Sequence, residues 1–345
     1  MRRPSRLGLA VVLSLLFVVS AYTVGWFFVA GRIEQGVAQW VEDMRVQDLD
    51  VSWRDRRVSG YPLAFRIELS EARLHRSAGA GGELRAPLLA ASARPWRLRT
   101  WQLSAPDGIS GTTGPAASPL ATLTARTADG RVAVFGEGAA DISLSLGEPV
   151  LVAGSADSGT RLAARTAALT LTLPPKEPQT HREPAVVSVL QLQDVTLPAV
   201  PSPLRSSVDY IEVGITLKGT IPPGSAREAA QAWRDAGGTL ELDGLHVHWG
   251  TLKLTAAGTA ALDTDMQPMG AFSGTIEGAD ELLTALGAAG RLRPRDAQLA
   301  KMALSMLARP GPDGRSRVAT SFTIQNGEMS LGPVKLGKAP RIAWE

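Results

Sequence analysis

Apolar and polar residues alternate along most of the chain after residue 48. The alternation is clearest at residues 65–69, 142–146, 169–173 and 211–217. Successive side chains of a β-strand point to opposite faces, so each segment predicts a strand with one apolar and one polar face. Strands of a parallel sheet are buried on both faces and would be apolar throughout. The pattern therefore predicts a mainly β protein, built as one antiparallel curved sheet or as two packed sheets.

Three dipeptides predict where strands turn or bend. Asp129-Gly130 and Asn326-Gly327 each separate two strand-like segments, and both dipeptides tolerate the positive φ angles of a tight hairpin turn. At Asp243-Gly244 the apolar residues change phase, from Leu240 and Leu242 to Leu245 and Val247. We expect hairpins at the first two sites and a bulge or tight turn at the third.

Helices are expected to be few and short. Ser225 and Glu228 have the spacing of a capping box, which predicts a helix from there to about Ala236, before Gly237-Gly238. Residues 279–289 and 294–307 are two further candidates, the second beginning with Pro294.

The first thirty residues predict a membrane anchor. Residues 7–30 contain no charged side chain, and as a helix they would extend roughly 36 Å, enough for a bilayer core of about 30 Å. Arg2, Arg3 and Arg6 precede this run, which favours a cytoplasmic N-terminus and an exported body. Cleavage near Val19-Ser20-Ala21 is the alternative, and it would release the body on the same side of the membrane.

The predicted organisation follows from these segments and from one proline-rich stretch, which contains four prolines and reads as an exposed linker or long turn. The expected parts are a cytoplasmic N-terminus (1–6), a transmembrane anchor (7–30), a juxtamembrane helix (31–47), a β-rich half (48–173), a proline-rich linker (174–185) and a second β-rich half with short helices (186–345).

Composition excludes several classes of function. The chain has 345 residues and a net charge of +3, and the three N-terminal arginines account for all of that charge. A body without net charge does not favour nucleic-acid binding. There is no cysteine, so thiol nucleophiles and zinc–thiolate sites are absent.

No catalytic, phosphate-binding or cofactor-binding template occurs in the sequence. His246 and His248 would share one strand face, but surface positions opposite Val247 explain them without a metal. We expect a protein that is not an enzyme and has no cofactor and no metal site.

The candidate functional surface is the apolar face of the predicted sheet. At least eight strands offer such a face, and three short helices would not cover it. If one curved sheet forms, this face lines a groove open toward the membrane, and two packed sheets would instead close it into a core. The expected lining residues are Ile211, Val213, Ile215 and Leu217.

Several segments together resemble the domain-of-unknown-function family DUF2125 of Gram-negative bacteria. The resemblance is carried by Gly60-Tyr61-Pro62 with Phe65, by Arg94-Pro95-Trp96, and by the tail 326–337 with Pro340. The family has no assigned reaction, so the resemblance supplies no catalytic residue. The N-terminal span and its flanking arginines predict an inner-membrane protein with a periplasmic body, or a periplasmic protein after cleavage. The architecture is also loosely similar to that of AsmA-like envelope proteins. The expected function is lipid handling or envelope assembly through the apolar face, and the alternative is a non-catalytic scaffold that docks a periplasmic protein.

Overall fold

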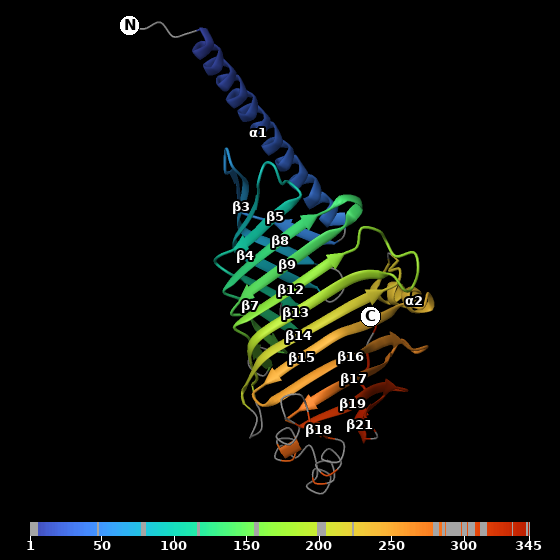
Figure 1. Cartoon of the computed structure of the whole chain (residues 1–345). Coiled ribbons are helices and arrows are strands. Elements are labelled where there is room, and N and C mark those ends of the chain that lie inside the picture. The colour runs from blue at the N-terminus through green and yellow to red at the C-terminus, as the bar shows by residue number, and fades with distance from the viewer. Residues whose placement is uncertain are drawn as a thin grey trace.

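One large antiparallel sheet forms the body of the protein, and a long N-terminal helix projects from one end of it (Figure 1). The computed structural model describes residues 6–46, 48–76, 81–115, 118–154, 159–198, 205–222, 224–278, 283–284, 287, 298, 302, 308–310, 316–332, 334–342 and 344. The single sheet agrees with the mainly β fold expected from the alternation. Of the two architectures left open by the sequence, it is the curved sheet.

The elements of the first half are α1 (Arg6–Val46), β1 (Leu49–Ser52), β2 (Asp55–Ser59), β3 (Phe65–Arg76), β4 (Gly82–Ala93), β5 (Thr100–Ala105), β6 (Ile109–Thr113), β7 (Ala121–Ala125), β8 (Thr127–Val134), the 3-10 turn η1 (Gly136–Gly138), β9 (Ala140–Gly147), β10 (Val150–Ala153), β11 (Thr160–Ala163) and β12 (Thr166–Leu173). Those of the second half are β13 (Pro184–Thr196), β14 (Ser207–Lys218), α2 (Ala226–Asp235), β15 (Thr239–Trp249), β16 (Leu252–Leu262), β17 (Pro268–Glu277), β18 (Arg309–Pro310), β19 (Ser316–Gln325), β20 (Glu328–Leu331) and β21 (Val334–Lys338).

The sheet is an antiparallel meander that extends away from α1. Its main run of paired strands begins with β2, β3, β4 and β5, continues through β8, β9 and β12 to β17, and ends with β19, β20 and β21. A second, narrower run consists of β1, β6, β7, β10 and β11, which pair with one another or with the outer ends of β3, β4 and β13. In Figure 1, β3 and β5 lie at the α1 end and β19 and β21 at the opposite end.

A line of bends, which we call the crease, separates these two runs. Glu71, Glu148 and Asp194 lie on it, with positive φ angles of 50°, 49° and 50°. Each carboxylate pairs with an arginine that belongs to the same line of bends or lies next to it: Arg54 with Glu71 at 2.9 Å, Arg126 with Glu148 at 2.9 Å and Arg165 with Asp194 at 2.6 Å. Because a left-handed residue within a strand redirects the chain, the repeated bends fold the sheet along one line.

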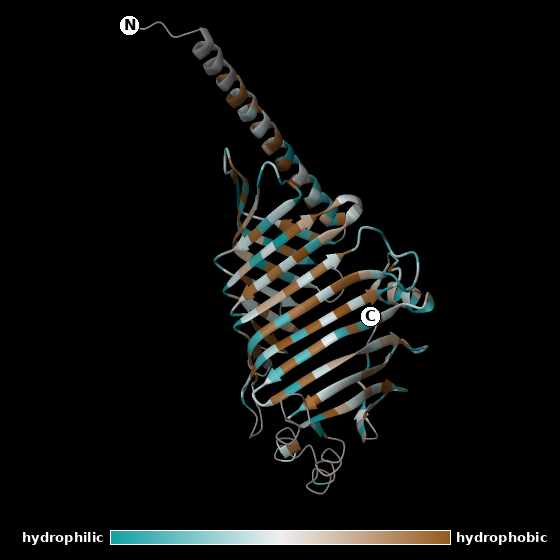
Figure 2. Cartoon of the chain, in the orientation of Figure 1, coloured by the Kyte–Doolittle hydropathy of each residue, from teal (hydrophilic) through white to brown (hydrophobic). Residues whose placement is uncertain are grey.

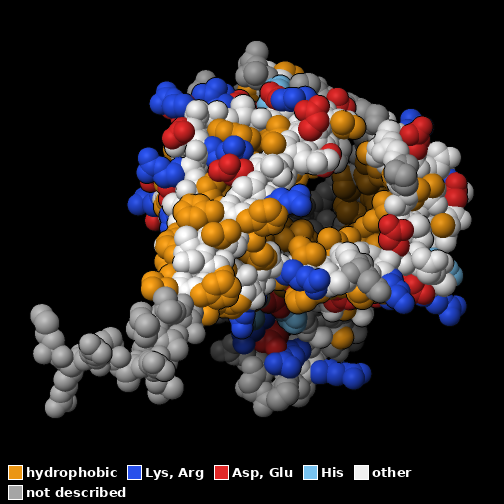
Figure 3. Space-filling view, turned by 90° about the horizontal axis from the view of Figure 1, so that it is seen from above, with side chains coloured by type: hydrophobic (Ala, Val, Ile, Leu, Met, Phe, Trp, Pro, Cys, Tyr) orange, Lys and Arg blue, Asp and Glu red, His pale blue; other side chains and the backbone are white. Residues whose placement is uncertain are grey.

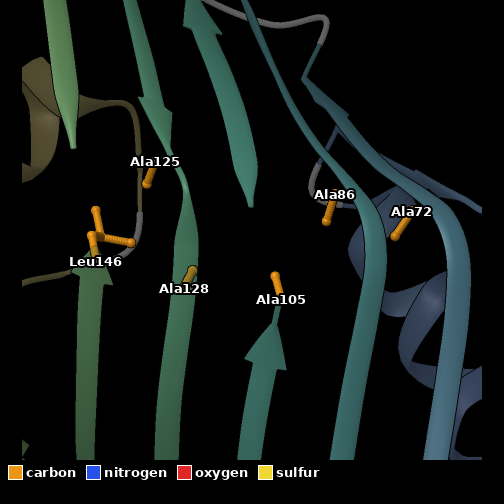
Figure 4. Close-up of a cluster of buried hydrophobic side chains, with 6 residues drawn as sticks. All are labelled: Ala72, Ala86, Ala105, Ala125, Ala128 and Leu146. Atoms are coloured by element: carbon orange, nitrogen blue, oxygen red, sulfur yellow. The ribbon is translucent and has the colours of Figure 1, made fainter. Parts of the chain in front are cut away.

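Small side chains fill the inner angle of the crease. Ala72, Ala86, Ala105, Ala125, Ala128 and Leu146 form one buried cluster and come from adjacent strands (Figure 4). Five of the six are alanines, which lets the two runs of strands approach closely where the sheet bends. Larger side chains, such as Leu69 and Leu123, pack around this cluster and are only partly buried.

Three local predictions are confirmed. Asn326 and Gly327 have φ angles of 53° and 71° and connect β19 to β20 in a hairpin. A register shift lies at Asp243-Gly244, between the pairs formed by Leu242 and Leu245, so a bulge occurs there. The capping box is present: Ser225 and Glu228 satisfy each other's backbone N–H groups at the start of α2.

The hairpin predicted at Asp129-Gly130 is wrong. Both residues lie inside β8, where Gly130 is paired with Leu103 of β5 and with Leu144 of β9. The chain does not reverse there; it bends at Arg126, between β7 and β8. The turn preference of this dipeptide is outweighed by hydrogen bonding to two neighbouring strands.

The N-terminal helix is continuous across the predicted end of the membrane span. α1 reaches Val46 without a break, and residues 16–46 form a helix long and apolar enough to cross a membrane. The predicted helices at 279–289 and 294–307 lie largely outside the described residues. The proline-rich segment connects β12 to β13, which are neighbours in the sheet, and the division of the body into two halves stays a prediction.

Candidate functional site

Four rows of mostly apolar side chains cross one face of the sheet, and we call the surface that they form the trough. Residues paired directly on adjacent antiparallel strands point to the same face, so pairing partners define each row. Between β9 and β16 the first row is Leu146, Ala167, Leu192, Ile211, Val247 and Leu254. The second is Leu144, Leu169, Leu190, Val213, Leu245 and Ala256.

The third row over the same strands is Ile142, Leu171, Ser188, Ile215, Leu242 and Gly258. The fourth is shorter and contains Val186, Leu217, Leu240 and Ala260. Figure 2 shows the resulting alternation of hydrophobic and hydrophilic positions along the strands. The second row continues in the same register to Val58 on β2 and to Gly274 on β17. Neighbouring strands of a sheet lie about 4.8 Å apart, so the row from β2 to β17 makes the apolar surface roughly 50 Å long.

The middle of the trough has no covering layer among the residues that the structure describes. Ile211, Val213 and Ile215 are only half-buried, although they lie in the central strands. Leu144 is 38% exposed, and Leu84, at the outer end of β4 where it pairs with β6, is 41% exposed. Viewed from the α1 end, the molecule is hollowed, and hydrophobic side chains gather around the hollow (Figure 3). The apolar face is therefore accessible from outside the protein.

α2 and the C-terminal segment flank one side of the trough. Trp233 of α2 is buried and donates its indole N–H to the carbonyl oxygen of Lys218 at 2.7 Å. Together with Leu217 and Leu240 of the fourth row, and with Trp344, it lines an apolar pocket of about 420 Å³. Because Leu217 and Leu240 belong to both surfaces, the pocket is continuous with the trough.

The second helix that contacts the trough is α1, at the β2–β5 end. Trp26 is 6% exposed and stacks on Phe65 of β3, with ring centroids 5.0 Å apart. Ala30 packs in the same cluster, together with Val58 of the second row and Trp101 of β5. α1 thus lies against one end of the trough, so the trough begins where the body meets α1.

The four residues expected to line a groove occupy one position in each row. Ile211, Val213, Ile215 and Leu217 belong to the first, second, third and fourth rows respectively. The structure brings them together on the apolar face of β14. Whether they contact a ligand stays a prediction.

His246 and His248 lie on the opposite, polar face. They are paired with Glu212 and Tyr210, and the carboxylate of Glu212 accepts hydrogen bonds from Tyr210 Oη and Gln191 Nε2. The hydrogen bond from Tyr210, and then that from Gln191, lower the pKa of Glu212. Within the described residues, no group of three His, Asp or Glu side chains is placed to hold a metal ion.

Sequence reasoning missed the parts of the site that depend on long-range packing. The positions of the crease were not recognised, although its apolar residues are spaced by three rather than two, as in Leu69 to Ala72 and Ala125 to Ala128. The contact between α1 and the trough has no signal in the sequence, because it joins Trp26 to a strand 39 residues away.

Comparison with known families shows one match, over residues 26–340, to the family described as an uncharacterised protein conserved in bacteria, DUF2125. The chain belongs to the DUF2125 family. The match covers the second half of α1 and nearly the whole sheet, in agreement with the resemblance seen in the sequence. The looser similarity to AsmA-like proteins receives no support from it and stays a hypothesis. No curated protein matches the chain at a significant level.

Proposed function

We propose that this DUF2125 protein is anchored in the inner membrane by α1, with its body in the periplasm, and that the trough holds the acyl chains of lipids. The observation that carries the proposal is the continuous apolar surface on a sheet over whose centre none of the described residues forms a second layer. Soluble proteins rarely expose contiguous apolar patches of this extent, and those that exist mark ligand or partner surfaces.

The dimensions of the trough suit a lipid. A bilayer core of about 30 Å contains two leaflets, so one extended acyl chain is about 15 Å long. A surface of roughly 50 Å can therefore hold more than one chain along its length. The polar face of the same strands, with Glu212 and His246, stays in water.

The position of α1 supports a lipid rather than a soluble apolar ligand. A helix that crosses the membrane would keep the body beside the bilayer, and its contact with Phe65 and Val58 would bring the beginning of the trough next to that bilayer. A cytoplasmic N-terminus, favoured by Arg2, Arg3 and Arg6, would put the body on the periplasmic side. The role is one of binding and transfer, and we propose no chemical reaction.

Site-specific photocrosslinking tests the proposal in the full-length protein. A benzophenone amino acid at Val213 faces the trough, and the same amino acid at the adjacent Glu212 faces the polar side. We expect covalent lipid adducts at 213 and not at 212, identified by mass spectrometry of the purified protein. A stoichiometric protein adduct at 213, without lipid, would instead support the scaffold that docks a periplasmic partner. Absence of any adduct at 213 would contradict both functions.

A further inference from the structure

A pocket with three arginines lies on the polar side of the sheet at the α1 end. It has a volume of about 390 Å³ and is lined by Arg94 and Arg97 from the β4–β5 connection and by Arg131 from β8. Ser92, Thr100 and Gln102 add polar groups, and no acidic residue is among its lining residues. Within the described part of the chain, none of the three guanidinium groups forms an ion pair.

Exposed apolar side chains adjoin this pocket, and we call them the apolar rim: Tyr61, Leu63, Trp96 and Leu98. Leu63 lines the pocket itself and is 67% exposed, whereas Trp96, on the same turn as Arg94 and Arg97, is 60% exposed. The guanidinium of Arg94 lies over the Trp96 ring, 6.0 Å from its centroid. Cations without an acidic partner beside protruding aromatic and aliphatic side chains are typical of surfaces at a membrane interface, where phosphates and acyl chains meet.

Contacts with α1 fix the depth of the rim relative to the membrane. The carbonyl oxygen of Pro62 accepts a hydrogen bond from Tyr22, the hydroxyl groups of Thr23 and Tyr61 lie 2.7 Å apart, and Trp26 donates its indole N–H to Ala64. The loop that carries Tyr61 and Leu63 is therefore attached to α1 at the level of residues 22–26.

The length of the apolar run places that level at the edge of the bilayer. The uncharged segment begins at residue 7, and at 1.5 Å per residue a bilayer core of about 30 Å takes roughly twenty residues, which ends near Trp26. If the membrane span ended at Ala21, before the residues of α1 that contact the loop, it would be only about 22 Å long, which is shorter than the bilayer core. The rim must then lie at the boundary between hydrocarbon and headgroups, and the arginine pocket beside it in the layer of lipid phosphates.

We propose that Arg94, Arg97 and Arg131 bind the phosphate of a phospholipid in the leaflet that faces the body, while Leu63 and Trp96 insert among its acyl chains. Guanidinium groups bind phosphate oxygens through paired N–H donors, and Gln102 and Thr100 supply further polar contacts. The bilayer is the occupant because the pocket is attached to α1. The inference needs α1 to cross the membrane and does not depend on what the trough holds.

The depth of the rim is tested by spin labelling, which the absence of native cysteine makes straightforward. The full-length protein with Leu63→Cys, in vesicles of phosphatidylethanolamine and phosphatidylglycerol, is labelled with a nitroxide. We expect strong relaxation by oxygen and weak relaxation by a water-soluble nickel chelate. Met269→Cys, which is 39% exposed on β17 and distant from α1, is the control and should show the reverse. Equal accessibility of both labels to the nickel chelate would overturn the proposal.

Phosphate binding is tested by a charge-matched pair of triple variants. Arg94→Gln, Arg97→Gln and Arg131→Gln together remove the pocket, and Arg161→Gln, Arg182→Gln and Arg227→Gln remove three exposed arginines elsewhere. A cationic side chain at an anionic membrane surface contributes about fivefold in affinity, so the first variant should retain phosphatidylglycerol about a hundredfold more weakly.

Native mass spectrometry of the full-length protein, extracted from the same vesicles, gives the retained lipid. The control triple variant should retain as much phosphatidylglycerol as the unmodified chain, and added inorganic phosphate should not displace it. Equal retention by both variants, or displacement by inorganic phosphate alone, would overturn the proposal even if the label at residue 63 lies in the bilayer. A failure of the trough to crosslink lipid would leave these results unchanged, so the two proposals fail separately.

Discussion

Arg165 Nε donates a hydrogen bond of 2.6 Å to Asp194 Oδ2 at the place where two neighbouring strands bend together. Asp194 has a φ angle of 50°, and the backbone N–H of Arg165 donates to the carbonyl oxygen of Gln193 at 2.9 Å. The ion pair thus connects two neighbouring bends of the crease, one at Arg165 just before β12 and one at Asp194 within β13. Both side chains are more than half exposed, so the ion pair itself contributes little, about 0–1 kcal/mol.

The backbone conformation of Asp194 should matter more than its charge. Asp194→Gly removes the ion pair but suits a positive φ, and we expect a loss of less than about 1 kcal/mol in the free energy of unfolding. Asp194→Val places a β-branched side chain at the same φ and should cost about 1–3 kcal/mol. Urea unfolding of the full-length protein in mild detergent measures both. Equal losses for the two variants, which both lack the carboxylate, would show that the ion pair dominates.

The inner angle of the crease should tolerate no added volume. Ala128 is 8% exposed and lies in the alanine cluster between β5 and β9, so Ala128→Leu should overpack the bend and cost about 1–3 kcal/mol. Ala271→Leu is the matched control, because Ala271 is exposed on a strand and should change stability by less than about 0.5 kcal/mol. Equal melting temperatures of the two variants would contradict a closely packed crease.

The contrast between Asn326-Gly327 and Asp129-Gly130 shows how far the sequence determines this fold. The alternation predicted the strands, and it also placed Ile211, Val213 and Ile215 on one face, because that depends only on the two-residue repeat of a strand. Asn326-Gly327 forms a turn because the strands on either side of it, β19 and β20, pair with each other as a hairpin. Asp129-Gly130 has the same local preference, but β8 pairs with β9 along its whole length and with β5 from Ala128 to Ala133. A dipeptide preference cannot show which strands will be available as partners.

The crease and the arginine pocket depend on contacts between distant residues. Arg126 and Glu148 are 22 positions apart, and each follows a strand that shows an ordinary alternation. Arg131 joins Arg94 and Arg97 only because β5 pairs with both β4 and β8. The spacing of three between apolar residues, as from Leu69 to Ala72, was the one local sign of a bend. Single occurrences of it are common in any β protein, so it becomes informative only when neighbouring strands show it in register.

The polar face offers a test of stability against pH. The hydrogen bond from Tyr210 is the main cause of the lowered pKa of Glu212, and the same bond raises the pKa of Tyr210. A lowered carboxyl pKa stabilises the fold above its ordinary value and stops doing so as the pH falls through the lowered pKa. A raised phenol pKa stabilises the fold below its ordinary value, and that contribution disappears as the pH rises through the raised pKa.

Tyr210→Phe should therefore be less stable than the unmodified protein by about 0.5–1 kcal/mol near neutral pH. The difference should shrink in acid, where Glu212 is protonated, and again in alkali, where Tyr210 ionises. Thermal unfolding of both proteins over a range of pH measures it. A difference that is constant across the whole range would show that the hydroxyl group acts only through packing.

The trough itself is tested by two identical substitutions on neighbouring residues of opposite faces. Val213 lies in the second row and Val189 on the polar face of the adjacent strand, and both are half-buried. If the trough is open, Val213→Glu leaves the carboxylate in water, so the melting temperature should fall by only a few degrees, as for Val189→Glu. Lipid retained by the purified full-length protein should decrease for Val213→Glu alone, because the charge interrupts the apolar row between Leu190 and Leu245. A collapsed melting temperature for Val213→Glu, with Val189→Glu unaffected, would mean that this row is a closed core, since a buried carboxylate without a partner costs several kcal/mol.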